Sequence, residues 1–156
     1  KLAADLKVAS ADHLMEINYE GIKALASSGV VGTLLPGTTF FLGKKKYAPY
    51  KELEKNGVNV AIATDYNPGS CSIQSMSFII MLSCIYLHMN IHEAIKSSTY
   101  IAAKSLMLEN EIGSIEKGKK ADILIWNLSR AEEIPYTVNN QQLKLILKNG
   151  KIIFTS

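Results

Sequence analysis

Apolar residues along the first 110 positions of the chain form two kinds of run, and the two kinds alternate. Short β-prone or continuous apolar runs that end in turn residues predict strands of a buried parallel sheet, whereas apolar residues at helical spacing predict helices. The predicted strands cover residues 8–10, 30–35 and 58–63. The predicted helices cover residues 18–28, 49–55, 74–88, 91–97 and 100–106. This alternation indicates β/α units around a parallel sheet.

The pattern changes after about residue 111, where helical spacing gives way to short β-prone runs. Three further strands are predicted at residues 121–126, 143–147 and 151–154. Asn149-Gly150, between the last two, is typical of a tight hairpin turn. We therefore expect an α/β fold in two parts. Residues 1–111 are predicted to form the C-terminal part of a (β/α)8 barrel, and residues 112–156 a segment of a small β-sandwich.

The first residues of the chain carry a separate signal. Lys1 to Lys7 contain no initiator Met and are typical of the last turns of a helix. Three barrel strands cannot close on themselves, because a closed barrel needs every strand paired on both sides. We therefore expect an N-terminal half of the barrel, upstream of this chain, as its partner.

Composition and charge are those of an ordinary globular domain and exclude two classes of partner. Hydrophobic residues make up 47% of the chain, and the net charge is only +3. The lysines lie in short clusters at 44–46 and 117–120, so no nucleic-acid-binding face is predicted. The most apolar stretch, residues 78–87, is far shorter than the roughly 20 residues of a membrane-spanning helix. It is predicted to be a buried helix, with no membrane partner.

Cysteine usage and the start of the sequence bear on the compartment. The two cysteines, Cys71 and Cys84, are too few for a disulfide framework. Both are predicted to be free thiols in a reducing environment. No signal peptide opens the sequence. We therefore expect a cytoplasmic protein.

Three predicted strand ends carry polar or reactive groups, and β/α barrels hold their catalytic groups at that end of the strands. The first strand is followed by Asp12-His13, the second by Pro36-Gly37-Thr38 and the third by Thr64-Asp65. A carboxylate beside an imidazole suits metal-dependent hydrolysis. The carboxylate can bind the ion and take a proton from water, while the imidazole polarises a carbonyl or moves protons.

Each of these residues also has a structural interpretation. Asp65 could be a helix cap or a turn former, and His13 a structural hydrogen-bonding residue. Asn67-Pro68-Gly69 is a common turn sequence. His88 and His92 are four positions apart and could bind zinc, but they flank a predicted helix end with no third ligand nearby. The spacing of the residues leaves these alternatives open.

Three segments, taken together, resemble the imidazolonepropionase family of amidohydrolases in their order and separations. They are Ser10-Ala11-Asp12-His13-Leu14, Leu34-Leu35-Pro36-Gly37 and Ala63-Thr64-Asp65-Tyr66-Asn67-Pro68-Gly69-Ser70. A fourth segment, residues 113–123, resembles the re-entry of amidohydrolases in general from the barrel into their small β-sandwich. The resemblance covers almost the whole chain.

The resemblance implies a role for each residue of the first and third segments. Asp65 matches the metal-binding aspartate that follows the last barrel strand. His13 matches an active-site histidine outside the metal shell, which contacts the substrate and polarises the ring carbonyl. Asn67, Gly69 and Ser70 match a loop that contacts the substrate. A turn directly before a helix N-terminus would present free N–H groups, so we expect this loop to favour an anion.

The activity implied by the resemblance is metal-dependent hydrolysis in histidine degradation. The ring C–N amide bond of 4-imidazolone-5-propanoate is opened to give N-formimidoyl-L-glutamate, and Asp65 accepts a proton from the attacking water. The implied cofactor is one divalent or trivalent metal ion, zinc or iron, with its other ligands upstream of Lys1. A homodimer is also expected. Two alternatives stay open: another amidohydrolase, such as a nucleobase or heterocycle deaminase, and a non-catalytic binding or assembly module.

Overall fold

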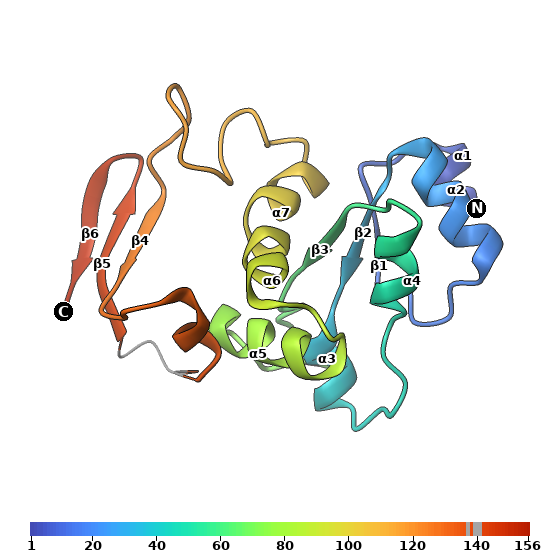
Figure 1. Cartoon of the computed structure of the whole chain (residues 1–156), viewed down its shortest axis with the longest axis horizontal. Coiled ribbons are helices and arrows are strands. Elements are labelled where there is room, and N and C mark those ends of the chain that lie inside the picture. Colours follow the sequence, from blue (N-terminus) through green and yellow to red (C-terminus); the bar gives the residue numbers. More distant parts are fainter. Residues whose placement is uncertain (137, 139–141) are drawn as a thin grey trace.

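The computed structural model describes residues 1–136, 138 and 142–156, and these residues form two three-stranded sheets with helices around the first (Figure 1). In chain order the elements are α1 Leu2–Asp5, β1 Ser10–Asp12, α2 Tyr19–Ser28, β2 Val31–Leu34, α3 Pro36–Phe41, α4 Tyr50–Lys55, β3 Val60–Ile62, α5 Met76–Tyr86, α6 Ile91–Ser98, α7 Tyr100–Ser105, β4 Ile123–Trp126, the 3-10 helix η1 Ala131–Tyr136, β5 Leu143–Lys148 and β6 Lys151–Thr155. The α/β layers therefore occupy the first two thirds of the chain, and the second sheet ends it.

The strands β1, β2 and β3 form a parallel sheet in that order, which confirms the predicted β/α alternation. In this register Asp12 lies opposite Thr33, and Thr33 lies opposite Ala61. Because the strands are parallel and closely in register, their carboxyl ends meet at one edge of the sheet. That edge carries the polar strand ends that the sequence singles out.

The main core lies between one face of this sheet and the helices α2, α4, α5 and α6 (Figure 1). Leu34 of β2 and Ile62 of β3 are buried together with Leu25 of α2 and Leu53 of α4. Burial of each such side chain contributes about 1.5–3 kcal/mol to folding. The apolar runs that predicted the strands are therefore the residues that hold the sheet against its helices.

The opposite face of the parallel sheet is covered at its amino end by α7. Ile101 of α7 packs against Val31 of β2 and Ala61 of β3. Side chains alternate between faces along a strand, so Thr33 shares this face with Val31. Its hydroxyl is buried and has no hydrogen-bond partner among the described residues. This face thus combines an apolar cover at one end with a polar group nearer the carboxyl edge.

Local capping explains where several helices begin and end. The side chain of Asn18 accepts a hydrogen bond from the N–H of Gly21 at the start of α2. Gly29, with a φ of 73°, ends the same helix in the left-handed region. Asn90 and Glu93 form a capping box at the start of α6. The predicted limits of both helices are confirmed to within one residue.

The second sheet is antiparallel, in the order β4-β5-β6. The turn between β5 and β6 is Asn149-Gly150, and both residues have positive φ, as the predicted hairpin requires. Several large apolar side chains of this sheet are exposed: Leu124, Ile125, Ile152, Ile153 and Phe154. In Figure 1 the sheet stands apart from the α/β layers, and η1 lies near α5 between them.

Two elements were not predicted, and several boundaries differ from the predictions: the helix predicted at 74–88 is Met76–Tyr86, and the strand predicted at 121–126 is Ile123–Trp126. The helix α3 was not predicted, because Pro36-Gly37 is a common turn signal; the structure instead uses Pro36 at the first turn of a helix, where its missing N–H costs nothing. The 3-10 helix η1 was not predicted either, and it contains Pro135. The strand predicted at 8–10 is Ser10–Asp12, since pairing with β2 begins only at Ser10.

No helix within the described part of the chain is both long enough and apolar enough to cross a membrane. The apolar stretch predicted to be a buried helix belongs to α5, which has 11 residues. Ile79 and Leu82 of this helix are almost fully buried. The apolar character of α5 is thus used for packing inside the α/β layers.

Candidate active site

The three polar strand ends come together at the carboxyl edge of the parallel sheet. His13 directly follows β1, Thr38 lies in α3 one turn after β2, and Asp65 lies three residues after β3. The sequence separates the last two by 27 positions, yet their side chains are in contact. The fold therefore places all three strand ends at one edge of the sheet, and it brings Thr38 and Asp65 into direct contact.

Asp65 is held in a particular conformation. Its φ is 52°, in the left-handed region that costs an ordinary residue free energy. The hydroxyl of Thr38 donates a hydrogen bond of 2.6 Å to its Oδ2 atom. The side chain of Asn67 donates another, of 2.7 Å, to its backbone oxygen. Both the carboxylate and the peptide group of Asp65 are thus fixed by neighbouring side chains.

The loop after Asp65 is organised around the side chain of Asn67. Its Oδ1 atom accepts hydrogen bonds from the backbone N–H groups of Gly69 at 2.9 Å and Ser70 at 2.8 Å. Its Nδ2 atom also lies 3.0 Å from the hydroxyl of Ser70. This is the local bonding expected of an asparagine that starts a turn. In this conformation Asn67 shapes the loop through nearly all of its polar atoms.

We expected the loop of Asn67, Gly69 and Ser70 to favour an anion because it would lie directly before a helix N-terminus, and this expectation is wrong. The helix α5 begins at Met76, several residues after the loop, and the side chain of Ser75 accepts a hydrogen bond from the N–H of Phe78 in its first turn. The N–H groups of Gly69 and Ser70 donate to Asn67 instead of lying free. The partial positive charge of a helix end therefore does not act at this loop.

Buried residues, chiefly Cys71 and Gly37, pack beneath the loop, and we call them its floor. Cys71 is fully buried, and its thiol donates a hydrogen bond to the backbone oxygen of Thr64 at 3.2 Å. The backbone N–H of Asn67 donates to the backbone oxygen of Cys71 at 2.8 Å. Gly37 approaches so closely that a Cβ atom there would lie 3.2 Å from the Cys71 sulfur. The loop is thereby tied to the start of α3.

His13 lies at the neighbouring strand end. Its φ is 66°, and its backbone N–H donates to the oxygen of Thr33 at 2.9 Å, which extends the β1–β2 pairing by one residue. Leu14 also has a positive φ, of 57°. Two successive residues in this conformation turn the chain sharply away from β1. The imidazole is exposed at the turn, where it can meet a ligand.

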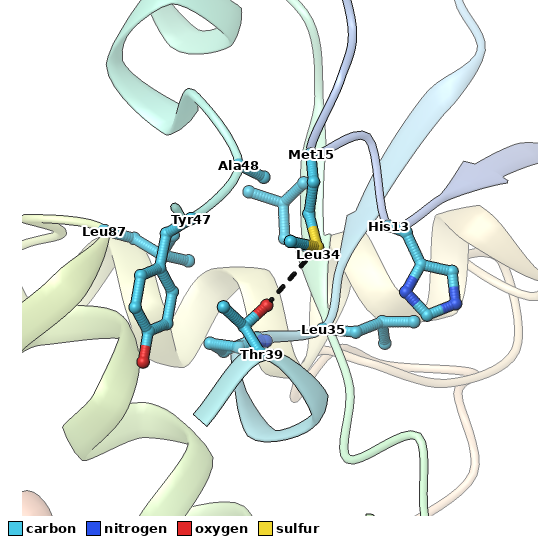
Figure 2. Close-up of a pocket in the computed structure, with 9 residues that line it drawn as sticks. His13, Met15, Leu34, Leu35, Thr39, Tyr47, Ala48 and Leu87 are labelled. Atoms are coloured by element: carbon cyan, nitrogen blue, oxygen red, sulfur yellow. Dashed lines mark hydrogen bonds between the residues drawn. The ribbon is translucent and has the colours of Figure 1, made fainter. Parts of the chain in front are cut away.

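Figure 2 shows a pocket beside this strand end. Its lining consists of His13, Met15, Leu34, Leu35, Pro36, Thr39, Tyr47, Ala48 and Leu87. Within it the hydroxyl of Thr39 lies 3.6 Å from the sulfur of Met15, so the two side chains meet (Figure 2). Most of the other lining groups are apolar. An apolar lining offers few groups for catalysis or metal binding, so we place the candidate site at the carboxyl edge of the sheet. The pocket is a packed region next to that edge, and His13 is part of its lining.

The donor set for a metal ion is incomplete within the described ranges of the chain. Asp65 offers one carboxylate, but no group of three or more His, Cys, Asp or Glu side chains there could hold an ion. His88 follows α5, whereas His92 belongs to α6 and lies 3.8 Å from Glu132. The two histidines thus flank a helix junction, as the sequence indicated. The carboxylate of Asp65 suits one position in the coordination of zinc or iron.

Sequence reasoning gave no role to Thr38 or to Cys71. Thr38 stands in the segment that the second strand end suggested, but nothing local indicates that its hydroxyl reaches Asp65. Cys71 is a free thiol, as predicted, but it is fully buried although the segment around it is polar. One local signal was Gly37, shortly after the second strand, because a glycine at such a position permits a close approach of another segment. The sequence did not identify the segment that approaches it.

Comparison with known proteins identifies the relatives of this chain. Residues 6–153 match the Amidohydrolase family. The chain is 44% identical over 153 residues to an imidazolonepropionase of Alkaliphilus oremlandii, covering 98% of this chain and 36% of that protein. It is 42% identical over 156 residues to an imidazolonepropionase of Phocaeicola vulgatus, covering 100% of this chain and 37% of that protein. The chain therefore spans little more than a third of these relatives.

Solved structures show the same fold. An adenosine deaminase of Xanthomonas campestris with bound zinc superposes with a TM-score of 0.85 at 22% identity, over 97% of this chain and 38% of that one. A guanine deaminase of Escherichia coli superposes with a TM-score of 0.80 at 16% identity, over 94% of this chain and 39% of that one. At these identities the likeness extends to the fold alone.

Proposed function

Because the chain belongs to the amidohydrolase family, we propose that the protein containing it hydrolyses the ring C–N amide bond of 4-imidazolone-5-propanoate, giving N-formimidoyl-L-glutamate. One observation carries the proposal. Asp65 and His13 lie at the same edge of a parallel sheet, in a chain 44% identical to an imidazolonepropionase over nearly all its length. We include histidine degradation, a cytoplasmic location and a homodimer in the same proposal, on the ground of that relationship.

The proposed architecture of the whole protein is a (β/α)8 barrel with an attached β-sandwich. Residues 1–111 would supply the last three strands of the barrel, and residues 112–156 part of the sandwich. The parallel sheet has β1 and β3 as open edges, which supports pairing with further strands from an N-terminal half. The exposed apolar side chains of the β4-β5-β6 sheet support a second sheet packed against it.

Asp65 is the proposed metal ligand of this chain and the proposed proton acceptor. Catalytic zinc sites use about three protein ligands. The described residues offer one, so we propose that the others come from residues upstream of Lys1. When bound, a zinc or iron ion would supply Lewis acidity and lower the pKa of a water molecule. The carboxylate of Asp65, which accepts a hydrogen bond from Thr38, would take the proton of the attacking water.

His13 and the loop after Asp65 are proposed to handle the substrate. The exposed imidazole of His13 can donate to the ring carbonyl oxygen as negative charge develops there. Asn67, Gly69 and Ser70 are proposed to contact the substrate from the facing loop. Since their polar groups bond to one another in this conformation, binding would use the exposed side of the loop or exchange one of these bonds.

A second candidate activity is hydrolytic deamination of a nucleobase or a related heterocycle. The TM-scores of 0.85 and 0.80 with an adenosine deaminase and a guanine deaminase favour it, because β/α barrels hold their catalytic groups at the carboxyl ends of the strands. The far lower identity to those proteins makes it the weaker candidate. A non-catalytic assembly module is the remaining alternative, and its test is metal content.

The experiment that tests the proposal compares substrates on the purified full-length protein. Ring opening of 4-imidazolone-5-propanoate is followed by its ultraviolet absorbance, and deamination of adenosine, guanine and cytosine by ammonia release. The expected result is ring opening alone, abolished by a chelator and restored by zinc or iron. Deamination without ring opening would transfer the assignment to the second candidate. Bound metal without turnover on any substrate would remove both.

A further inference from the structure

The hydrogen bond between Thr38 and Asp65 is short and has a defined direction. The hydroxyl donates to Oδ2 at 2.6 Å, since an ionised carboxylate can only accept. Distances of about 2.5–2.7 Å are those of charge-assisted O–H···O⁻ bonds, which are stronger than neutral ones. The contact joins α3 to the residue that follows β3, 27 positions later. It is therefore a tertiary contact made at the carboxylate itself.

The donor in this bond is held by the core of the protein. Thr38 is only 7% exposed, and its neighbour Thr39 only 4%. As a β-branched residue in a helix, Thr38 has few χ1 rotamers available. Gly37 brings this turn of α3 against the buried side chains of Ile79 and Cys71. The position of the Thr38 hydroxyl is thus fixed by the packing of α3 and does not depend on the loop that carries Asp65.

The acceptor, by contrast, needs support. Asp65 is half-buried and has a left-handed φ, and an aspartate carboxylate rotates broadly about χ2 when nothing restrains it. Asn67 fixes only the backbone oxygen of Asp65. The Thr38 hydroxyl is the one group among the described residues that hydrogen-bonds the carboxylate. It restrains the rotation and leaves Oδ1 available to a cation.

We propose that Thr38 is a positioning residue that orients the Asp65 carboxylate as a metal ligand, an inference that rests on the proposed function. Hydrogen bonds to metal-binding carboxylates orient the ligand, and their loss costs about 10–100-fold in metal affinity or activity. Thr38 acts through Asp65 and touches neither substrate nor ion. Thr38 affects the orientation of the Asp65 carboxylate, and this effect depends on the Thr38 hydroxyl alone.

The test uses three variants of the full-length protein and two measurements that need no substrate. Thr38→Val keeps the shape of the side chain and removes the hydroxyl, and Thr38→Ser keeps the hydroxyl. Thr39→Val is the matched control, since Thr39 is similarly buried in the same helix and, among the described residues, its hydroxyl bonds only to the sulfur of Met15. Zinc affinity is measured by competition with a chelator, and ligand geometry by the visible absorption spectrum of the cobalt(II) form.

Thr38→Val is expected to lower zinc affinity by about 10–100-fold and to change the cobalt spectrum, at a melting temperature close to that of Thr39→Val. Thr38→Ser is expected to restore both properties. Wild-type affinity and spectrum in Thr38→Val would overturn the proposal, as would an equal loss in Thr39→Val or no rescue by Thr38→Ser. These measurements stay valid if the wild-type protein fails to open imidazolone, which would count against the proposed function alone. In an active protein, kcat should fall in Thr38→Val while KM changes little.

Discussion

The thiol of Cys71 donates a hydrogen bond of 3.2 Å to the backbone oxygen of Thr64, the residue directly before Asp65. The bond comes from a fully buried side chain, and the backbone of the same residue accepts from the N–H of Asn67. Both ends of the loop are therefore tied to one buried position. The geometry of the candidate site therefore depends on the packing of buried residues beneath the loop. Substitutions that disturb this packing should change the geometry of the site.

The close approach of Gly37 to this floor gives a test by stability. A Cβ atom at Gly37 would lie 2.7 Å from Cδ1 of Ile79, which is fully buried and cannot move freely. We expect Gly37→Ala to destabilise the full-length protein by about 1–3 kcal/mol through overpacking. Thermal unfolding measures the effect.

The control for this prediction removes the clashing atom. Ile79→Val lacks Cδ1 and alone should cost about 0.5–1.5 kcal/mol. The double variant Gly37→Ala with Ile79→Val should be more stable than the sum of the two single effects predicts, because each change relieves the other. Strict additivity would mean that Gly37 is not held against Ile79 in the way described.

Replacing Asp65 by Ala should remove a metal ligand and the proposed proton acceptor together. We expect the full-length variant to lose bound metal and to lose activity by at least about 10²–10⁴-fold, while it keeps its fold. Metal content is measured by elemental analysis, and folding by circular dichroism. A variant that retained its metal and near-normal turnover would show that Asp65 is a turn-forming residue only.

His13→Ala should separate rate from metal binding. The imidazole is exposed at a strand end and is proposed to act on the substrate carbonyl, so its loss should cost about 10²–10⁴-fold in kcat. Metal content should stay at the wild-type level, since His13 is not proposed as a ligand. Stoichiometric loss of the ion would instead make His13 part of the coordination.

Residues 1–156 produced alone should be inactive and should associate. The strands β1 and β3 are edge strands, and large apolar side chains are exposed on α3 and on β6. Sedimentation velocity and the ring-opening assay provide the measurements, with the full-length protein as reference. A stable, active monomer would contradict both the partial barrel and the need for ligands from elsewhere.

Much of the fold could be predicted because its signals are local. The continuous apolar runs around Val31 and Ala61 gave the buried strands, and Asn149-Gly150 gave the hairpin that the structure contains. The helix α3 escaped prediction because Pro36-Gly37 has a strong turn preference. Burial of Thr38 and Thr39 against the rest of the α/β layers outweighs that preference. Intrinsic propensity is a weak effect beside such packing.

By itself the sequence determined the alternation of strands and helices, the carboxyl-edge location of His13 and Asp65, and the relationship to amidohydrolases. Only the tertiary structure decided that Thr38 bonds to the Asp65 carboxylate, that Cys71 lies beneath the loop, and that the loop is separate from the N-terminus of α5. The physical reason is the range of the interactions. Periodicity and turn preference act over a few residues, whereas a hydrogen bond across 27 positions exists only after the register of β2 and β3 brings its partners together.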